Sequence, residues 1–171
     1  MKKRITACSL PLGSIIETKQ HNAYFSDSYR FSSPFPERTA LEVWLAHMAT
    51  IPNWVKRLMT LRNQLVSKLG LKNLGQIDDL ESGKAAKAYQ AGDKVGIFTL
   101  LSVSDGEIIL CDSDKHLDVQ ISVYKEKQQN DVVTISTVVH VHNLLGRVYM
   151  LFVTPAHKMI VPATIRRAEF Q

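Results

Sequence analysis

Four side chains that can bind a metal or transfer protons alternate along two neighbouring stretches of the sequence. His116 and Asp118 lie in the first stretch, and His140 and His142 lie in the second. If a hairpin between them turns around Gln129, Asp118 opposes His140. His116 then opposes His142, and all four side chains lie on one face of a sheet. Zinc accepts imidazole and carboxylate ligands, and a carboxylate beside a histidine also supports proton transfer.

The position of these four residues argues against a metal site. They lie on the polar face of their sheet, which the architecture derived below turns to solvent. Short His-x-His spacings are common on exposed strands, where the side chains are solvated or pair with one another. We therefore expect no bound metal and no cofactor. A metal-dependent enzyme and a homodimer formed through this face stay as alternatives.

A second set of residues has the composition of a ligand-binding cavity, because it combines large aromatic side chains with a few polar anchors. The set comprises Phe25, Asp27, Tyr29, Trp54, Arg62, Phe98, Thr137, Tyr149 and Phe152. For any one of these residues, a place in a fully packed core is the competing interpretation. Arg62, for example, can run its stem along a helix and keep its guanidinium in water.

Two titratable residues are open to more than one interpretation. Asp27 falls on the same face of its predicted strand as Phe25 and Tyr29, which directs the carboxylate inward. A β-bulge would instead direct it to solvent. His157 follows Pro155, and we expect it to hydrogen-bond carbonyl groups that the proline leaves without a donor, rather than to catalyse a reaction.

The elements that position these residues begin with one strand and two helices. Residues 22–31 alternate apolar and polar side chains, which predicts a half-buried strand, whereas residues 1–21 show no sustained period and form an irregular lead-in. Thr39 and Glu42 form a capping box that opens one helix, and Pro52 begins another. The predicted inner stripe of the second helix is Trp54, Leu58, Leu61, Leu65 and Leu69.

Four further strands follow a long connection. Residues 71–93 form this connection, which is either a flap over a cavity or a passive surface loop. The sequence then alternates with a period of two between turns, of which Asp105-Gly106 is the clearest. The predicted strands are 94–103, 107–112, 116–124 and 133–142. They form an antiparallel meander with one apolar face.

The last element is a long helix over residues 143–170. Apolar residues cover one stripe and much of the opposite side, so we expect burial all round. The stripe contains Leu145, Val148, Tyr149, Phe152, Ala156, Met159, Ile160 and Ala163. Pro155 and Pro162 predict a kink or a short break. The simplest architecture is an α+β fold whose curved antiparallel sheet wraps around this helix, with two helices between the first strand and the rest of the sheet.

Length and composition limit the class of protein. The 171 residues, 45% of them hydrophobic, suit a single domain over 22–171. The net charge of +5 is dispersed and lacks an aromatic-and-basic strand motif, so we expect no nucleic-acid partner. Arg147 and Lys158 interrupt the most apolar segment, and the first residues lack the apolar core of a signal peptide. We therefore expect a cytoplasmic protein without a membrane span.

An ordered set of short motifs resembles a known bacterial family. The motifs are Trp54-Val55, Leu58-Met59, Leu61-Arg62-Asn63, Lys94-Val95-Gly96-Ile97-Phe98, His116-Leu117-Asp118, Val139-His140, His142-Asn143, Leu145-Gly146-Arg147, Tyr149, Pro155 and His157. From residue 22 to the C-terminus the chain is similar to the domain of unknown function two-eight-six-seven family. That family is placed in the START-like superfamily, which includes polyketide cyclases and aromatases.

The resemblance implies a helix-grip fold, in which a curved sheet encloses a long C-terminal helix. It also implies an internal cavity for lipids, hormones, polyketides or other hydrophobic molecules, sometimes with chemistry. The family lends no established catalytic residue. Because the superfamily sheet is usually larger than five strands, an additional strand is expected in residues 71–93.

Three hypotheses for function follow. The first is a binding protein that encloses a hydrophobic or amphipathic small molecule between sheet and C-terminal helix, with Asp27 or Arg62 orienting its polar end. The second is an enzyme, either a cyclase or hydratase working in the cavity or a metal enzyme at the four-residue polar cluster. The third is a dimerising structural or interaction module.

Overall fold

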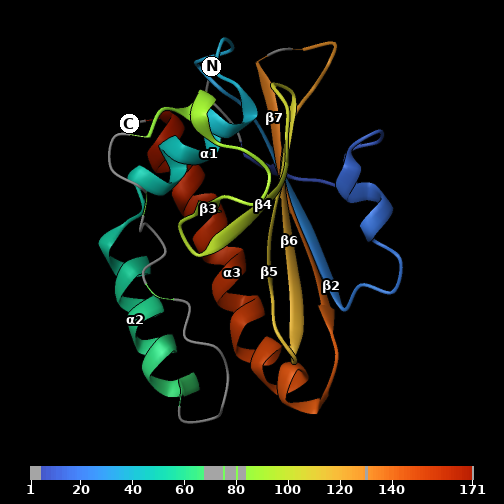
Figure 1. Cartoon of the computed structure of the whole chain (residues 1–171), viewed down its shortest axis with the longest axis vertical. Helices are drawn as coiled ribbons and strands as arrows, with labels where there is room; N and C mark the ends of the chain where they lie inside the picture. The colour runs from blue at the N-terminus through green and yellow to red at the C-terminus, as the bar shows by residue number, and fades with distance from the viewer. Residues whose placement is uncertain (1–4, 68–74, 76–79, 81–83, 130, 171) are drawn as a thin grey trace.

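The computed structural model of the chain describes residues 5–67, 75, 80, 84–129 and 131–170. These residues form an α+β fold with a seven-stranded antiparallel sheet and a long C-terminal helix (Figure 1). The strands are β1 (Thr6–Ala7), β2 (Phe25–Ser32), β3 (Lys94–Val95), β4 (Phe98–Val103), β5 (Glu107–Ser113), β6 (Leu117–Lys125) and β7 (Val132–Val141). The helices are α1 (Ala40–Ala49), α2 (Asn53–Ser67) and α3 (Leu144–Phe170), with short 3-10 turns η1 (Ile15–Lys19) and η2 (Ala86–Ala88).

The sheet has two strands more than the five that the sequence predicts. Its order is β1-β2-β7-β6-β5-β4-β3. β1 comes from the lead-in, where Thr6 pairs with Arg30 of β2. The predicted strand 94–103 divides into β3 and β4 at Gly96, whose φ of 62° suits glycine. In residues 71–93, the described positions contain only η2, and the rest of that segment lies outside the described residues.

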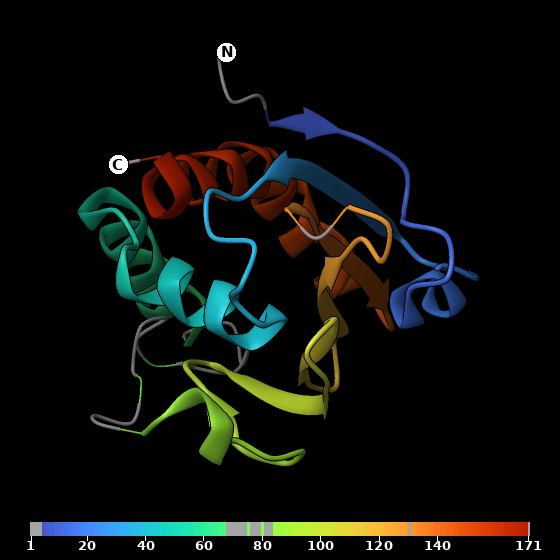
Figure 2. The same ribbon diagram turned by 90° about the horizontal axis from the view of Figure 1, so that it is seen from above.

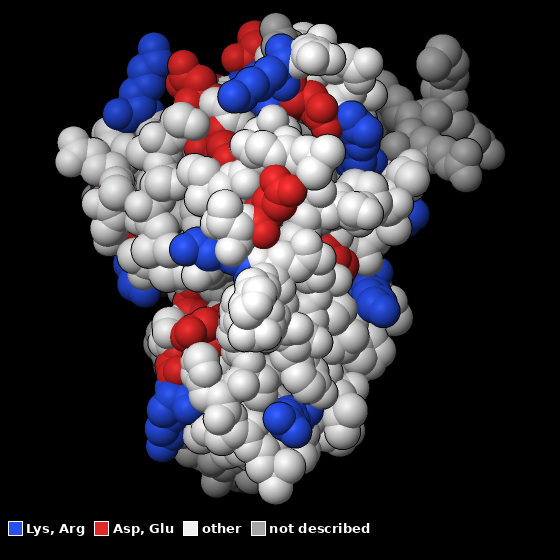
Figure 3. All heavy atoms as spheres, turned by 90° about the vertical axis from the view of Figure 1, so that its right-hand side faces the viewer, with Lys and Arg blue, Asp and Glu red and all other residues white. Residues whose placement is uncertain are grey.

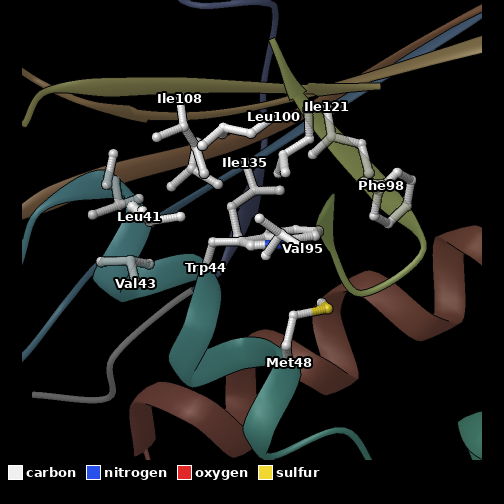
Figure 4. Packing of buried hydrophobic residues seen from close by; sticks show 14 of the residues in the cluster. Leu41, Val43, Trp44, Met48, Val95, Phe98, Leu100, Ile108, Ile121 and Ile135 are labelled. Carbon is white, nitrogen blue, oxygen red and sulfur yellow. The ribbon is translucent and has the colours of Figure 1, made fainter. Parts of the chain in front are cut away.

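One face of the sheet curves around α1 and α3, and we call it the concave face (Figure 2). Apolar residues of the central strands point to it, because alternate positions of a strand share a face. Trp44 of α1 lies among Val95, Phe98 and Ile135 of this face (Figure 4). Its ring meets the Phe98 ring edge-on at a centroid distance of 5.8 Å. α1 therefore fills the space between the sheet and α3.

Local sequence signals determine where α1 and α2 begin, as predicted. The Thr39 hydroxyl accepts a hydrogen bond from the Glu42 backbone at 3.2 Å, and the Glu42 carboxylate accepts one from the Thr39 backbone at 2.7 Å. This is the predicted capping box. α2 begins directly after Pro52, also as predicted.

The predicted inner stripe of α2 is wrong. Trp54, Leu58 and Leu61 are 40%, 41% and 51% exposed. Val55 is buried instead, and Met59 packs on the main core. Both stripes are apolar and lie side by side on the helix, so periodicity alone could not select the one that faces inward. The Leu65 side chain and Leu69 lie outside the described residues.

The expectation that α3 is buried all round is also wrong. The helix continues through Pro155 and Pro162 without a break, and its buried residues are Gly146, Met150, Ile165 and Glu169. Val148, Phe152 and Met159 of the predicted inner stripe are exposed. The reason is that the sheet and α1 cover one side of α3 only. By length and composition α3 could cross a membrane, since an 18-residue window has a mean hydropathy of 1.3. Only 11% of that window is buried within the described structure.

The last turn of α3 is fastened by buried polar groups. Glu169 accepts a hydrogen bond of 2.5 Å from the Ser33 hydroxyl, and its other oxygen lies 4.0 Å from Nδ1 of His47. His47 is fully buried in α1, and burial lowers the pKa of its imidazole. The C-terminal end of the chain is thereby tied to both α1 and the end of β2.

The opposite, convex face of the sheet is covered in part by residues 8–23. Leu10 and Ile16 pack on Ile109 and Val138. Glu107 of β5 is buried beneath this segment and accepts hydrogen bonds from the Ser14 hydroxyl, the Ile15 backbone and the Ser122 hydroxyl. The lead-in therefore contributes a strand and a 3-10 turn to the fold.

We predict that Gly146→Ala destabilises the protein, because a Cβ at this position would lie 2.5 Å from the His116 carbonyl oxygen and 2.9 Å from Val141. The backbone of α3 must then move away from the sheet, at a cost of about 1–3 kcal/mol of unfolding free energy. Urea denaturation measures this loss. Gly106→Ala is the matched control, since nothing lies within 4 Å of the added carbon. Equal stability of the two variants would contradict the close approach.

A second prediction concerns the pH dependence of stability. Because burial holds the pKa of His47 below its ordinary value, the unfolded chain binds more protons as the pH falls. Stability is therefore full above the unfolded pKa of about 6.5 and declines below it, by up to about 1.4 kcal/mol per pH unit from this group. In denaturation series between neutral and mildly acidic pH, His47→Leu should show a shallower decline than wild type. His142→Leu, at an exposed position, should keep the wild-type slope.

Candidate functional site

A carboxylate on the concave face meets a histidine of α3. Asp27 pairs in register with Thr137 of β7, and the β2–β7 pairing continues without a shift from Phe25 to Ser32. The strand therefore has no bulge at this point, and the Asp27 side chain, 13% exposed, points inward. Of the two interpretations that the sequence allows for Asp27, the inward one is found.

The partner of Asp27 is His157. Its Nε2 lies 3.1 Å from Asp27 Oδ1, and its ring stands edge-on to the Phe25 ring at 5.6 Å. The prediction that His157 hydrogen-bonds carbonyl groups freed by Pro155 is wrong. His157 falls on the side of α3 that packs on β2, whereas Pro155 is exposed on the other side.

The second oxygen of this carboxylate is not satisfied. Asp27 Oδ2 is buried, and no group in the described part of the chain forms a hydrogen bond with it. The Tyr29 hydroxyl lies beside the carboxylate and interacts with it. Burial, and then the negative charge of Asp27, raise the pKa of Tyr29. Tyr29 therefore stays protonated at neutral pH and can donate a hydrogen bond.

The arrangement has two chemical capacities. A buried carboxylate with a free acceptor site can receive a hydroxyl or amine donor from a bound molecule. A histidine oriented by a carboxylate can also transfer a proton, because the carboxylate stabilises the protonated imidazole. We call Asp27, Tyr29 and His157 the β2–α3 polar site.

The four-residue polar cluster has the predicted register. Asp118 pairs with His140, and the His142 backbone donates to the His116 carbonyl at 2.9 Å. The side chains nevertheless turn to separate partners. Asp118 bonds the Ser113 hydroxyl and lies 3.0 Å from His142 Nε2.

The other two histidines of that cluster contact residues outside it. Nε2 of His140 lies 3.1 Å from the His21 carbonyl oxygen, and Nδ1 of His116 lies 3.1 Å from the Asn143 side chain. Within the described ranges, no three His, Cys, Asp or Glu side chains are grouped so that they could hold a metal ion. The cluster is thus a pair, Asp118 with His142, and two histidines that bind the turns around them.

The proposed cavity residues separate into three groups. Phe25 of β2 and Tyr149 of α3 both pack against the cluster of Leu117, Val139 and Met150, and Phe25 lies two residues from Asp27, which pairs with Thr137. Phe98 belongs to the packed core beside Trp44. Trp54 and Phe152 are exposed, so the prediction that they line the interior is wrong. The two residues lie on α2 and α3, which carry apolar side chains on their exposed sides as well as on their buried sides.

Arg62 connects two helices. Its Nε donates to the Tyr149 hydroxyl at 3.0 Å, and its guanidinium lies 5.4 Å from the centre of that ring. A second donor reaches the Asn63 side chain. Arg62 therefore holds α2 beside α3.

Sequence reasoning missed the buried groups His47, Glu107 and Glu169. Glu169 had a usable signal, since it lies one helical turn after Ile165 on the inner side of α3. Glu107 had none, because a glutamate that opens a strand after a turn is normally solvated.

Comparison with known proteins gives one match. A family model described as "Protein of unknown function (DUF2867)" covers residues 20–164. No curated protein and no solved structure shows significant similarity to the chain.

We predict that Asp27 and His157 are energetically coupled. In a double-mutant cycle with Asp27→Asn and His157→Gln, the coupling energy should be about 1–3 kcal/mol, because the pair is largely desolvated. Asp118 and His142 are the control pair at a similar distance, and their exposure should hold the coupling to about 0–1 kcal/mol. Urea denaturation of the single and double variants measures both. Equal coupling in the two pairs would contradict the burial of the β2–α3 polar site.

Proposed function

Because the chain belongs to the DUF2867 family, whose description names no activity, we propose a function from the site: binding of a hydrophobic or amphipathic small molecule between the concave face and α3. Asp27 and His157 would hold the polar end of this molecule. We further propose that the architecture is of the START-like, helix-grip class. Support for this assignment comes from a curved antiparallel sheet with a long C-terminal helix on its concave side.

One observation carries the proposal, namely the unsatisfied and buried Oδ2 of Asp27. A buried polar atom without a partner costs stability. Eight other side-chain atoms of the described residues are also without a partner, but Asp27 is partly exposed and pairs with a histidine of α3. Glu107, buried on the other face, has a full set of donors. A hydroxyl or amine group on a bound molecule would supply the donor that Asp27 lacks.

The surroundings suit an apolar body attached to that polar group. Phe25 of β2 and Tyr149 of α3 pack against one apolar cluster between the sheet and α3, and Tyr29 packs at the margin of the main core. Aromatic side chains of this kind bury large apolar areas. Each Å² of ligand surface removed from water contributes roughly 25 cal/mol before ordering costs.

A cyclase- or hydratase-type enzyme is the second candidate. It is favoured by the same pair, since Asp27 orients His157 and leaves Nδ1 of its ring without a hydrogen bond to any described residue. An imidazole oriented by a carboxylate, with a protonated tyrosine near that carboxylate, is a general acid–base arrangement. Binding without turnover is the simpler proposal, because it requires only the acceptor oxygen and the aromatic walls.

The binding proposal predicts that gently purified protein carries a non-covalent adduct in native mass spectra, and that denaturation releases it. Asp27→Leu should lower the adduct-bearing fraction at least about tenfold, because loss of a hydrogen bond to a charged group costs about 1.5–3 kcal/mol. Asp118→Leu, on β6 at the other side of β7, is the matched control and should retain the adduct.

Circular dichroism of both variants establishes that they are folded. The proposal fails if wild-type protein carries no adduct even after incubation with a total lipid extract. It also fails if Asp27→Leu and wild type carry the same adduct to the same extent.

A further inference from the structure

A row of large apolar side chains covers the side of α3 that faces away from the sheet. Its members are Leu144, Val148, Leu151, Phe152 and Met159, which are 75%, 44%, 66%, 74% and 64% exposed. Their spacing of four, three, one and seven residues places them on one side of a helix. We call this surface the outer face of α3. A contiguous exposed apolar surface of this kind marks an interaction site.

The neighbouring helix α2 also exposes large apolar side chains. Trp54, Leu58 and Leu61 form an exposed stripe on α2, which the contact between Arg62 and Tyr149 fixes beside α3. Leu12 and Leu101, two other exposed leucines, lie on unrelated segments. Large exposed apolar side chains are therefore most numerous on α2 and α3.

The charges on these helices have one sign. α2 and α3 contain the cations Lys56, Arg57, Arg62, Arg147, Lys158, Arg166 and Arg167, and one acidic residue, Glu169, which is buried. Arg147 and Lys158 are exposed about one turn before and two turns after Leu151, and they border the outer face of α3. By contrast, acidic and basic side chains are interspersed on the face of the molecule seen in Figure 3.

We propose that the outer face of α3, together with the exposed stripe of α2, docks on the surface of an anionic lipid bilayer. The apolar side chains enter the boundary between headgroups and acyl chains, and the bordering cations contact anionic headgroups. Long basic side chains suit this position, because their stems lie along the apolar surface while their charges stay in the headgroup layer.

The buried contacts on the inner side of α3 favour a helix that lies on the membrane surface over one that crosses the membrane. Met150 and Ile165 are buried in the two cores, and Glu169 is bonded to Ser33. Withdrawal of α3 into a bilayer would uncover the concave face and break these contacts. A second copy of the chain is a poorer occupant, because two copies of this face would bring their cations together without an exposed acidic partner.

Flotation of the full chain with vesicles tests the proposal, and the test does not depend on ligand binding at the β2–α3 polar site. Mixed phosphatidylglycerol–phosphatidylcholine vesicles should bind the protein at least about tenfold more tightly than pure phosphatidylcholine vesicles, with the difference reduced at high salt. The double variant Leu151→Ser/Phe152→Ser should lower binding at least about tenfold. These positions are exposed, so the fold should be unchanged. Leu12→Ser, at a residue 84% exposed on the N-terminal segment, should bind as wild type does.

Charge reversal at Arg147 and Lys158, to Glu, should remove the preference for anionic vesicles. Absence of vesicle binding, equal binding to both vesicle types, or full binding by the Leu151→Ser/Phe152→Ser variant would each overturn the proposal. Light scattering distinguishes self-association: a wild-type dimer that this variant converts to a monomer would make the outer face a contact between copies, and would overturn it as well.

Discussion

The structure depends on burial of the concave face of the sheet beneath α1 and α3. Its central strands supply the apolar side chains, and α1 places Trp44 and its neighbours in the space that α3 alone would leave open. Removal of this apolar area from water is the main favourable term available to a chain of this size. Because both helices lie on the same side of the sheet, α3 is covered on one side only. The exposed apolar row on its outside is a direct result.

Three carboxylates, Glu107, Glu169 and Asp27, show how polar groups are placed within this arrangement. Glu107 secures the N-terminal segment on the convex face, and Glu169 secures the last turn of α3. Glu107 has donors at both oxygens, whereas one oxygen of Glu169 accepts from Ser33 and the other only lies 4.0 Å from Nδ1 of His47. Asp27 also has one oxygen with a partner, His157, and one without a donor among the described residues, but its side chain is 13% exposed whereas that of Glu169 is fully buried. Partial exposure beside a histidine of α3 distinguishes the carboxylate to which we assign a binding role.

Local and pairwise signals in the sequence predicted much of the fold. The capping box at Thr39, the start of α2 after Pro52 and the opposition of Asp118 to His140 depend only on neighbouring residues or a tight turn. The orientation of α2 and α3 was predicted wrongly, because apolar residues cover more than one stripe of each helix. β1 was missed, since a strand of two residues has no period to detect.

The candidate site was also predicted only in part, because local patterns determine some of its residues and long-range contacts determine the others. Alternation along β2 suggested the inward direction of Asp27, and the register then placed it opposite Thr137. Its partner on α3 is 130 residues away in sequence, and no local pattern connects His157 to that strand. Divergence of the His116 and His140 side chains likewise depends on contacts with Asn143 and His21, which periodicity does not describe.

The shortness of β1 and β3 has a consequence for assembly. Within the described residues, these two-residue strands are the lateral borders of the sheet. Such borders offer few unpaired backbone groups to an incoming polypeptide, which discourages growth of the sheet from one molecule to the next. Recognition of other molecules is thereby left to side chains.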